Sequence, residues 1–252
     1  MLASLSLVEE FISIQGEGKY QGHLAIFLRF FGCNLNCYGF DVKQISNKTG
    51  DTLIGCDTIR AVFTSHFDAT QIQTEDEILN LVNARIKGLK KLPMIVITGG
   101  EPLLHHKNKI FINLVSKLIN SGFKIQFETN SSIFVDFEKF PIYKKCSFAM
   151  SVKLKNSGEK YEKRINKEAI KAICENSYDS FYKFVILGKD KELDEINDIL
   201  KIYNQDVWCM PMGSNKIELE KNALNVANFA IKNGFNYSDR MHIRIWDNKE
   251  GV

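Results

Sequence analysis

Residues 24–37 read LAIFLRFFGCNLNC, an apolar run that ends in a glycine and two cysteines. A short run rich in Ile, Leu and Phe is typical of a buried strand. It is well below the ~20 apolar residues of a membrane-spanning helix, and Arg29 interrupts it. The stretch therefore predicts a core strand over residues 25–30 that is followed by a polar loop bearing cysteines.

Similar apolar runs recur along the chain, and segments with helical spacing lie between them. The runs cover residues 94–98, 124–128, 146–151, 181–187, 207–210 and 242–246. The helical spacing occurs over 78–86, 111–118, 170–174, 193–200 and 226–230, and the last of these segments ends at Asn233-Gly234. Because parallel strands need crossover helices, this alternation predicts βα units around a parallel sheet. About six units fit, which leaves an open doubly wound sheet or an incomplete barrel.

The composition is that of one large folded domain, residues 1–252. The chain is 44% hydrophobic and 25% charged. Its charges are scattered and sum to only +3, so we expect a small-molecule ligand and no nucleic-acid partner. The start of the chain has no basic segment and reaches Glu9 and Glu10 early, unlike a secretory signal. We expect a cytoplasmic protein without membrane contact, in which the six cysteines are reduced thiols or metal ligands.

Polar residues follow four of the predicted strands. They are Gly32 to Cys37, Thr98 to Pro102 (TGGEP), Glu128 to Asn130 (ETN) and Ser151 to Lys153 (SVK). In α/β sheets, ligands bind at the carboxyl ends of the strands. Taken alone, a Gly-Gly pair is commonly a tight turn, and a Cys-x3-Cys pair is commonly buried core sulfur. Together these segments predict one polar site at one end of the sheet.

With these segments in this order, the chain resembles the radical S-adenosylmethionine (SAM) enzymes. It is most similar to the 7-carboxy-7-deazaguanine synthase family of queuosine and 7-deazapurine biosynthesis. The similar segments are ISIQGEG at 12–18, Gly22, FLRF at 27–30, GCNL at 32–35, TGGEP at 98–102, ETN at 128–130, SVK at 151–153, MPM at 210–212, and RMH at 240–242 with Trp246 and the ending Gly251-Val252. The resemblance covers nearly the whole chain and implies an α/β fold, an incomplete (β/α)6-type parallel barrel of the radical SAM kind.

The resemblance also implies a [4Fe-4S] cluster, although one cysteine of the usual Cys-x3-Cys-x2-Cys motif is missing. Phe40 stands in the place of the third cysteine. The Asp-Thr pair that follows that cysteine in the family occurs here as Cys56-Asp57-Thr58. The implied ligands are therefore Cys33, Cys37 and Cys56, with an inserted cluster loop at about 42–55. Three soft thiolates leave one iron open for SAM, whereas structural zinc would need a fourth ligand.

The insertion lies in a stretch, residues 42–74, that breaks the alternation of strand and helix. This stretch is rich in Asn, Thr, Asp and Gly and has a short apolar interlude at 59–63, so we expect an ordered loop. The family usually has an aromatic residue before the third cysteine, against the SAM adenine, and this chain has Gly55 there. Of the other cysteines, Cys146 and Cys174 fit core positions, and Cys209 stands at a strand end.

The activity implied by the resemblance is that of a carbon-nitrogen lyase. Such an enzyme converts 6-carboxy-5,6,7,8-tetrahydropterin to 7-carboxy-7-deazaguanine with release of ammonia, through a SAM-derived radical rather than a catalytic side chain. The implied substrate contacts are Ile14, Gln15, Gly16, Arg29, Thr98 and Val252. The implied SAM contacts are Gly100, Glu101, Ser151, Val152, Lys153, Met210, Pro211, Met212 and Gly213. Thr58 is implied to bind Mg2+, and the implied partners are flavodoxin or ferredoxin as electron donor and a second copy of the chain in a homodimer.

Several alternatives remain open at this point. Arg29 lies in an apolar strand, where an unpaired guanidinium is costly, so it needs an anionic partner. That partner is either a structural carboxylate or the substrate carboxylate. The chain as a whole is alternatively another radical SAM enzyme, such as a glycyl-radical activase, or a non-catalytic metal-binding homologue.

Overall fold

The computed structural model describes residues 4–249 and 251, and within these residues no helix is long and apolar enough to cross a membrane. Nine strands form one sheet in the order β11-β10-β9-β8-β7-β6-β2-β1-β5. The strands are β1 Leu5–Ile14, β2 Leu24–Phe30, β5 Thr70–Ile72, β6 Met94–Gly99, β7 Ile125–Thr129, β8 Ser147–Met150, β9 Asp179–Ile186, β10 Val207–Pro211 and β11 Asn236–Tyr237. The helices are α1 Ile59–Val62, α2 Glu75–Ile86, α3 Lys109–Asn120, α4 Tyr161–Arg164, α5 Lys167–Asn176, α6 Asp190–Ile202, α7 Lys216–Asn233 and α8 Met241–Trp246.

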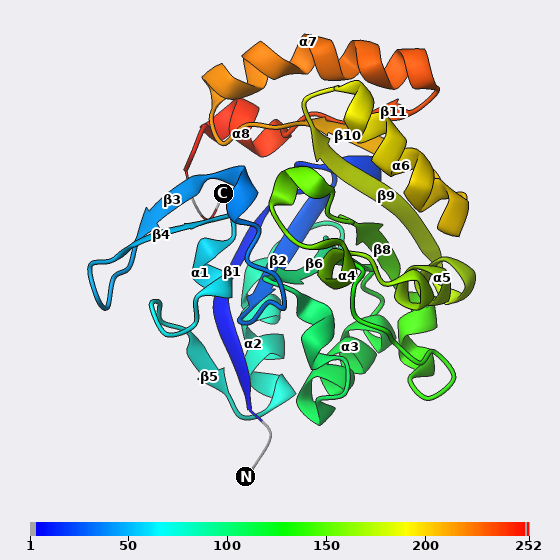
Figure 1. Ribbon diagram of the computed structural model, residues 1–252. Helices are drawn as coiled ribbons and strands as arrows, with labels where there is room; N and C mark the ends of the chain where they lie inside the picture. The colour runs from blue at the N-terminus through cyan, green and yellow to red at the C-terminus, as the bar shows by residue number, and fades with distance from the viewer. Residues whose placement is uncertain (1–3, 250, 252) are drawn as a thin grey trace.

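The sheet confirms the predicted α/β architecture. Strands β2, β6, β7, β8, β9 and β10 are parallel and adjacent in chain order, and helices α2, α3, α5, α6 and α7 lie outside the curved sheet (Figure 1). The sheet ends in β11 on one side and β5 on the other, so it is an open, incomplete barrel. Strand β1, which the sequence analysis missed, pairs antiparallel with β2 and extends the sheet beyond the six parallel strands.

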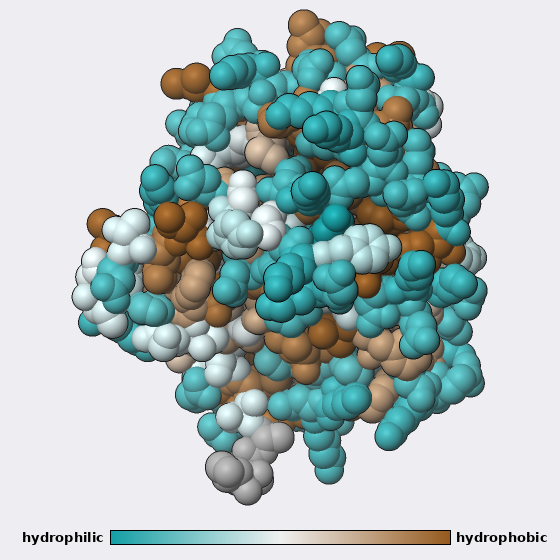
Figure 2. All heavy atoms as spheres, viewed as in Figure 1, coloured by the Kyte–Doolittle hydropathy of each residue, from teal (hydrophilic) through white to brown (hydrophobic). Residues whose placement is uncertain are grey.

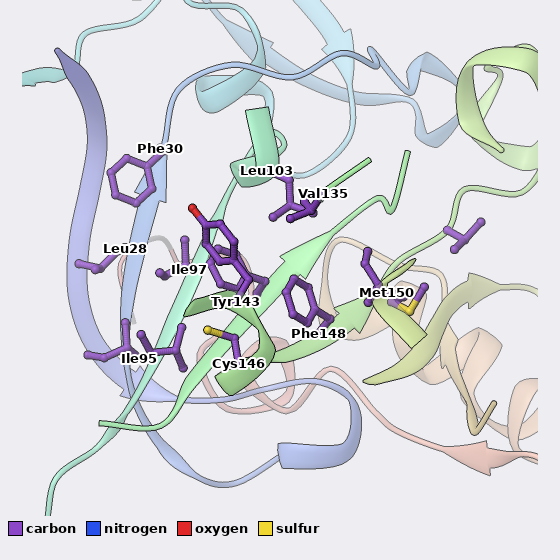
Figure 3. Close-up of a cluster of buried hydrophobic side chains, with 14 of the residues drawn as sticks. Leu28, Phe30, Ile95, Ile97, Leu103, Val135, Tyr143, Cys146, Phe148 and Met150 are labelled. Carbon is purple, nitrogen blue, oxygen red and sulfur yellow. The ribbon is translucent and has the colours of Figure 1, made fainter. Parts of the chain in front are cut away.

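The two faces of the sheet have different surroundings. On the outer face, alternate residues such as Leu28, Phe30 and Ile97 pack with the helices in the main hydrophobic core (Figure 3). Cys146 is fully buried in this core, as predicted. On the inner face, a smaller cluster contains Ala25, Phe27 and Val96, with Phe11 stacked on Phe27 at 4.9 Å. Because side chains alternate along a strand, Arg29 and Thr98 share this inner face.

The predicted insertion is ordered, but it is not a plain loop. Residues 42–55 form an antiparallel hairpin of β3 Val42–Ile45 and β4 Thr52–Gly55, which projects at the left of Figure 1. Most of the face seen in Figure 2 is hydrophilic, and hydrophobic residues gather in the region of this hairpin. Its Ile45 and Ile54 side chains are 67% and 43% exposed.

One predicted strand is wrong. Residues 242–246 form helix α8, Met241–Trp246, rather than a strand. The edge of the sheet next to β10 is already occupied by β11. The helix begins where the Met241 N–H donates to the Gly16 carbonyl at 2.9 Å. A five-residue apolar run cannot distinguish the two periodicities by itself, and here the tertiary contact decides.

Candidate active site

The cysteine loop begins directly after β2 and is held by its neighbours at several points. The Gly32 N–H donates to the Ala61 carbonyl at 2.8 Å. The backbone N–H groups of Asn36 and Cys37 donate to one oxygen of Glu159 at 2.6 and 3.3 Å. Cys37 itself has a left-handed backbone, with φ of 48°. These contacts place the loop at the carboxyl end of the sheet, as predicted.

The hairpin returns Cys56 to this loop. Val42 pairs with Gly55, so the two ends of the insertion are adjacent. A Cβ on Gly55 would lie 3.2 Å from the Asn36 carbonyl oxygen, which places β4 against the cysteine loop. Cys56 therefore enters the site from the end of a hairpin, with eighteen residues between it and Cys37 in sequence, and lies near Cys37 in space.

The thiols of Cys33, Cys37 and Cys56 are close enough to act on one another electrostatically. Burial raises the pKa of Cys33 and of Cys37 to about 12, and the neighbouring thiols add to this effect. Burial also raises the pKa of Cys56, whose sulfur lies 3.0 Å from the Thr58 hydroxyl. A thiol in such a place becomes a thiolate when a cation compensates its charge, as a metal centre does.

These three thiols fit an iron-sulfur cluster better than a single metal ion. Across residues 4–249 and 251, no three His, Cys, Asp or Glu side chains approach closely enough to hold one ion. A four-iron cluster is larger than one ion, so its ligands stand further apart. Soft sulfur ligands, three in number and without a fourth, also match a cluster with an open iron.

The Gly-Gly pair at the end of β6 packs against the cysteine loop. A Cβ on Gly100 would lie 2.4 Å from the Gly32 carbonyl oxygen and 2.6 Å from the Cys33 Cβ, so only glycine fits. The next residue, Glu101, is fully buried. Its carboxylate accepts hydrogen bonds from the Leu103 N–H at 2.9 Å, the Thr129 hydroxyl at 2.8 Å and the Asn130 N–H at 2.6 Å. Burial outweighs these bonds and raises its pKa to about 7.

The segment Ser151 to Lys153 follows β8 beside the same loop. Lys153 Nζ donates to the Ser151 hydroxyl at 2.8 Å and lies 5.8 Å from the centre of the Phe40 ring. Its ammonium also lowers the pKa of Cys37 in opposition to burial. Phe40 and residues 151–154 line a small cavity together with Asn156 and Val185. The residue that replaces the usual third cysteine thus faces the predicted SAM segment.

Two predicted substrate residues, Gln15 and Thr98, meet on the Glu128 carboxylate, which the sequence analysis placed at this end of the sheet without assigning it a ligand. Glu128 accepts from Gln15 Nε2 at 3.2 Å and from the Thr98 hydroxyl at 3.2 Å. Two residues earlier on β7, Gln126 is fully buried, and neither of its amide atoms has a hydrogen-bond partner within the described chain. A buried amide without a partner indicates space for water or a polar ligand.

Lys183 and Glu17 complete this polar set. Lys183 Nζ lies 2.7 Å from Glu17 Oε2 and 3.4 Å from Glu128 Oε1, and its side chain is 6% exposed. Burial raises the pKa of Glu17, but the ammonium of Lys183 and the guanidinium of Arg240 outweigh it and hold the pKa well below its usual value. Lys183 lies within an apolar run of the sequence, as Arg29 does. A charged side chain in such a run needs an ionic partner, so Lys183 could have been recognised from the sequence.

Arg29 has a carboxylate partner in the protein. Its Nε lies 2.6 Å from Glu9 Oε1, across the β1–β2 pair. Both side chains remain partly exposed, at 20% and 25%. The guanidinium is therefore held in place on the inner face of the sheet without being sealed from a ligand.

The remaining predicted residues lie in the loops after β1 and β10, at the end of β1 opposite the start of β2, or outside the described chain. Ile14 ends β1, and Gly16 packs against the His242 ring so closely that a Cβ would lie 2.1 Å from Nδ1. The segment from Met210 to Gly213 leaves β10, where the Met212 N–H donates to Ile186 O at 2.9 Å. Val252, predicted to close the substrate pocket, lies outside the described residues.

Comparisons with known proteins agree with this geometry. Residues 14–174 match the family described as a 4Fe-4S single cluster domain. A 7-carboxy-7-deazaguanine synthase from Clostridium acetobutylicum is 31% identical over 259 residues, covering 98% of each chain. Another, from Halobacterium salinarum, is 27% identical over 262 residues and covers 97% of this chain and 91% of the relative.

The fold has a counterpart among solved structures. The crystal structure of QueE from Escherichia coli aligns with a TM-score of 0.67 at 20% sequence identity and covers 95% of each chain. At that identity the likeness concerns the fold, while the sequence matches establish kinship. The chain belongs to the 4Fe-4S single cluster domain family and to the 7-carboxy-7-deazaguanine synthase family.

Proposed function

We propose that the protein converts 6-carboxy-5,6,7,8-tetrahydropterin to 7-carboxy-7-deazaguanine with release of ammonia, as a carbon-nitrogen lyase. The observation that carries the proposal is the meeting of Cys33, Cys37 and Cys56 at the carboxyl end of the sheet, in a chain of this family. These thiols would hold the [4Fe-4S] cluster. When bound, the cluster and SAM supply the radical chemistry, and the protein supplies orientation and protection.

The side chains around the thiols would prepare the cofactor site. Each thiol must lose its proton to bind iron, and the Lys153 ammonium favours the thiolate of Cys37. The close packing of Gly100 on Cys33 brings the backbone of the Gly-Gly-Glu segment to the cluster loop. We propose that Gly100, Glu101, residues 151–153 and residues 210–213 bind SAM there. Phe40, at the edge of the cavity, would offer the aromatic surface that Gly55 lacks.

The inner face of the sheet would bind the pterin. Carboxylates accept hydrogen bonds from the N–H groups of a pterin ring, and Glu128 and Glu17 stand at the site with Gln15 and Thr98. Lys183 holds both carboxylates in place, and it helps to keep the pKa of Glu17 below its usual value. Arg29 would bind the substrate carboxylate, since a guanidinium makes paired hydrogen bonds with a carboxylate, while Glu9 holds it in position.

Thr58 would bind Mg2+ through its hydroxyl, which suits a hard cation. A flavodoxin or ferredoxin would supply electrons, the active form would be a homodimer, and the enzyme would work in the cytoplasm, where thiols stay reduced.

The test is an anaerobic assay of the cluster-reconstituted protein with SAM, Mg2+, a reductant and 6-carboxytetrahydropterin, followed by mass spectrometry. We expect 7-carboxy-7-deazaguanine, with SAM regenerated rather than consumed. The control is Cys174→Ala, which changes a cysteine packed against the main core and outside the site. A cluster that cleaves SAM without forming deazaguanine would refute the substrate, and a chain that forms no cluster would refute the proposal as a whole.

A further inference from the structure

Arg240 connects three loops of the site, and its guanidinium uses one nitrogen for each. Nε donates to Glu17 Oε1 at 2.9 Å, in the loop after β1. Nη1 donates to the Gly213 carbonyl at 2.7 Å, in the segment after β10. Nη2 forms an ion pair with Asp57, between Cys56 and Thr58. The Arg240 side chain is 8% exposed, so these contacts are made largely away from water.

The Asp57 contact matters because of the insertion. Cys56 and Asp57 follow a hairpin rather than the short cysteine loop usual for radical SAM proteins, so they need their own attachment. Within the contacts described for the chain, the Asp57 carboxylate is attached to the body of the protein through Arg240, although its side chain is 52% exposed. The Glu17 end of the same guanidinium is buried, with Lys183 on the other carboxylate oxygen.

A planar guanidinium is well suited to such a junction. It presents five N–H donors in a rigid fork, whereas lysine offers a single charged point. A lysine at position 240 could keep one of the two ion pairs but could not also reach the Gly213 carbonyl in the same geometry. The arrangement therefore depends on the shape of the group and not on its charge alone.

We propose that Arg240 is a positioning residue that fixes the far end of the inserted cluster loop against the loops that carry Glu17 and Gly213. The proposal rests on the proposed function for what those loops bind. Without Arg240, Cys56 would lose its fixed distance from Cys33 and Cys37, while the hairpin and the sheet would remain folded.

The first test measures the thiols directly in the reduced, cluster-free full-length chain. We compare Arg240→Gln, Arg240→Lys and the control Arg244→Gln, which removes an ion pair between helix α8 and Asp239, the residue before Arg240. Alkylation rates are measured for each cysteine by peptide mass spectrometry. Local opening exposes a group in proportion to its population, so we expect Cys56 to react about tenfold faster in both Arg240 variants, while buried Cys146 is unchanged.

A second variant removes the same contact without touching the buried guanidinium. We expect Asp57→Asn to raise the Cys56 rate as Arg240→Gln does, and the double variant to show no further increase, because both changes remove the Asp57–Arg240 ion pair. In the reconstituted protein, we expect Arg240→Gln, Arg240→Lys and Asp57→Asn each to form more 5'-deoxyadenosine per deazaguanine than the wild type or Arg244→Gln does. We also expect the EPR signal of the cluster to change in these three variants.

The outcomes separate this inference from the proposed function. A Cys56 rate that is unchanged, or that rises together with that of Cys146, would overturn the positioning role, since the second result reports general unfolding. Failure of the wild-type protein to form a cluster or deazaguanine would refute the proposed function, while the alkylation rates would still decide the role of Arg240.

Discussion

Glu101 gives the chain a pH dependence that can be calculated from its surroundings. Its carboxyl group is fully buried, and burial raises its pKa from 4.5 to about 7 despite three hydrogen bonds from Leu103, Thr129 and Asn130. The folded protein therefore holds this proton more tightly than the unfolded chain does. The stability that the protonated Glu101 contributes to the folded state is fully present below about pH 4.5 and is lost as the pH rises through about 7.

The size of the effect follows from the same two values. At 1.36 kcal/mol per pKa unit, the difference corresponds to about 3 kcal/mol of unfolding free energy. Glutamine does not titrate, so the wild type should lose about 3 kcal/mol relative to Glu101→Gln between pH 4.5 and pH 8. The glutamine amide keeps one of the two acceptor oxygens, so a constant destabilisation at every pH is expected in addition.

The assay is urea unfolding of the cluster-free protein under anaerobic, reducing conditions at several pH values. The quantity of interest is the difference in unfolding free energy between wild type and Glu101→Gln at each pH. The surface variant Glu138→Gln, at a side chain that is 84% exposed, controls for changes in net charge. A difference that does not vary with pH, or that grows in favour of the wild type as the pH rises, would refute the reasoning.

Three further changes test the inner face and the cofactor side of the site. Lys183→Met removes the ammonium that Glu17 and Glu128 share, which leaves Glu17 with Arg240 alone, so we expect a loss of about 3 kcal/mol in urea unfolding, and an unchanged midpoint would contradict this. Arg29→Ala should abolish deazaguanine formation while iron and sulfide content stay at wild-type levels; loss of the cluster as well would count against a substrate role. Phe40→Ala should weaken SAM binding roughly tenfold in equilibrium dialysis of the reconstituted protein, as the loss of an aromatic stacking surface implies, and an unaltered Kd would exclude Phe40 as that surface.

The parallel sheet could be predicted from the sequence because its strands are buried on both faces. Uniformly apolar runs such as residues 94–98 and 124–128 have few other interpretations, and their carboxyl ends mark the site. Strand β1 could not be recognised in this way. It lies beyond the parallel strands, most of its residues are half-buried, and Glu9 and Glu10 interrupt its apolar pattern.

Part of the site could be predicted from the sequence. The site residues that were not predicted are mostly those whose roles depend on contacts between distant segments. Glu9 has no distinctive local pattern, and Glu17 lies in the family-like segment 12–18 but received no role from it; the roles of both follow only from their contacts in the structure. Lys183 was recognisable, because a lysine in a buried strand needs an anionic partner just as Arg29 does. Arg240 contacts Glu17 and Asp57, which precede it by 223 and 183 positions in the sequence. No local pattern reveals contacts between segments so far apart.

The assignment of Cys56 as the third cluster ligand uses both the sequence and the structure. The family resemblance implied Cys56 as the third ligand, but the sequence could not show how a residue so far from Cys37 reaches the cluster loop. The register of the hairpin supplies that reason, since Val42 opposite Gly55 closes the insertion on itself.

The most direct test of the account is the iron and acid-labile sulfide content of Cys56→Ala after anaerobic reconstitution, compared with the wild type and with Cys174→Ala. We expect the wild type and Cys174→Ala to bind a full [4Fe-4S] cluster and Cys56→Ala to lose most of its iron and its ability to cleave SAM. Wild-type cluster content in Cys56→Ala would contradict the assignment of Cys56 as the third ligand.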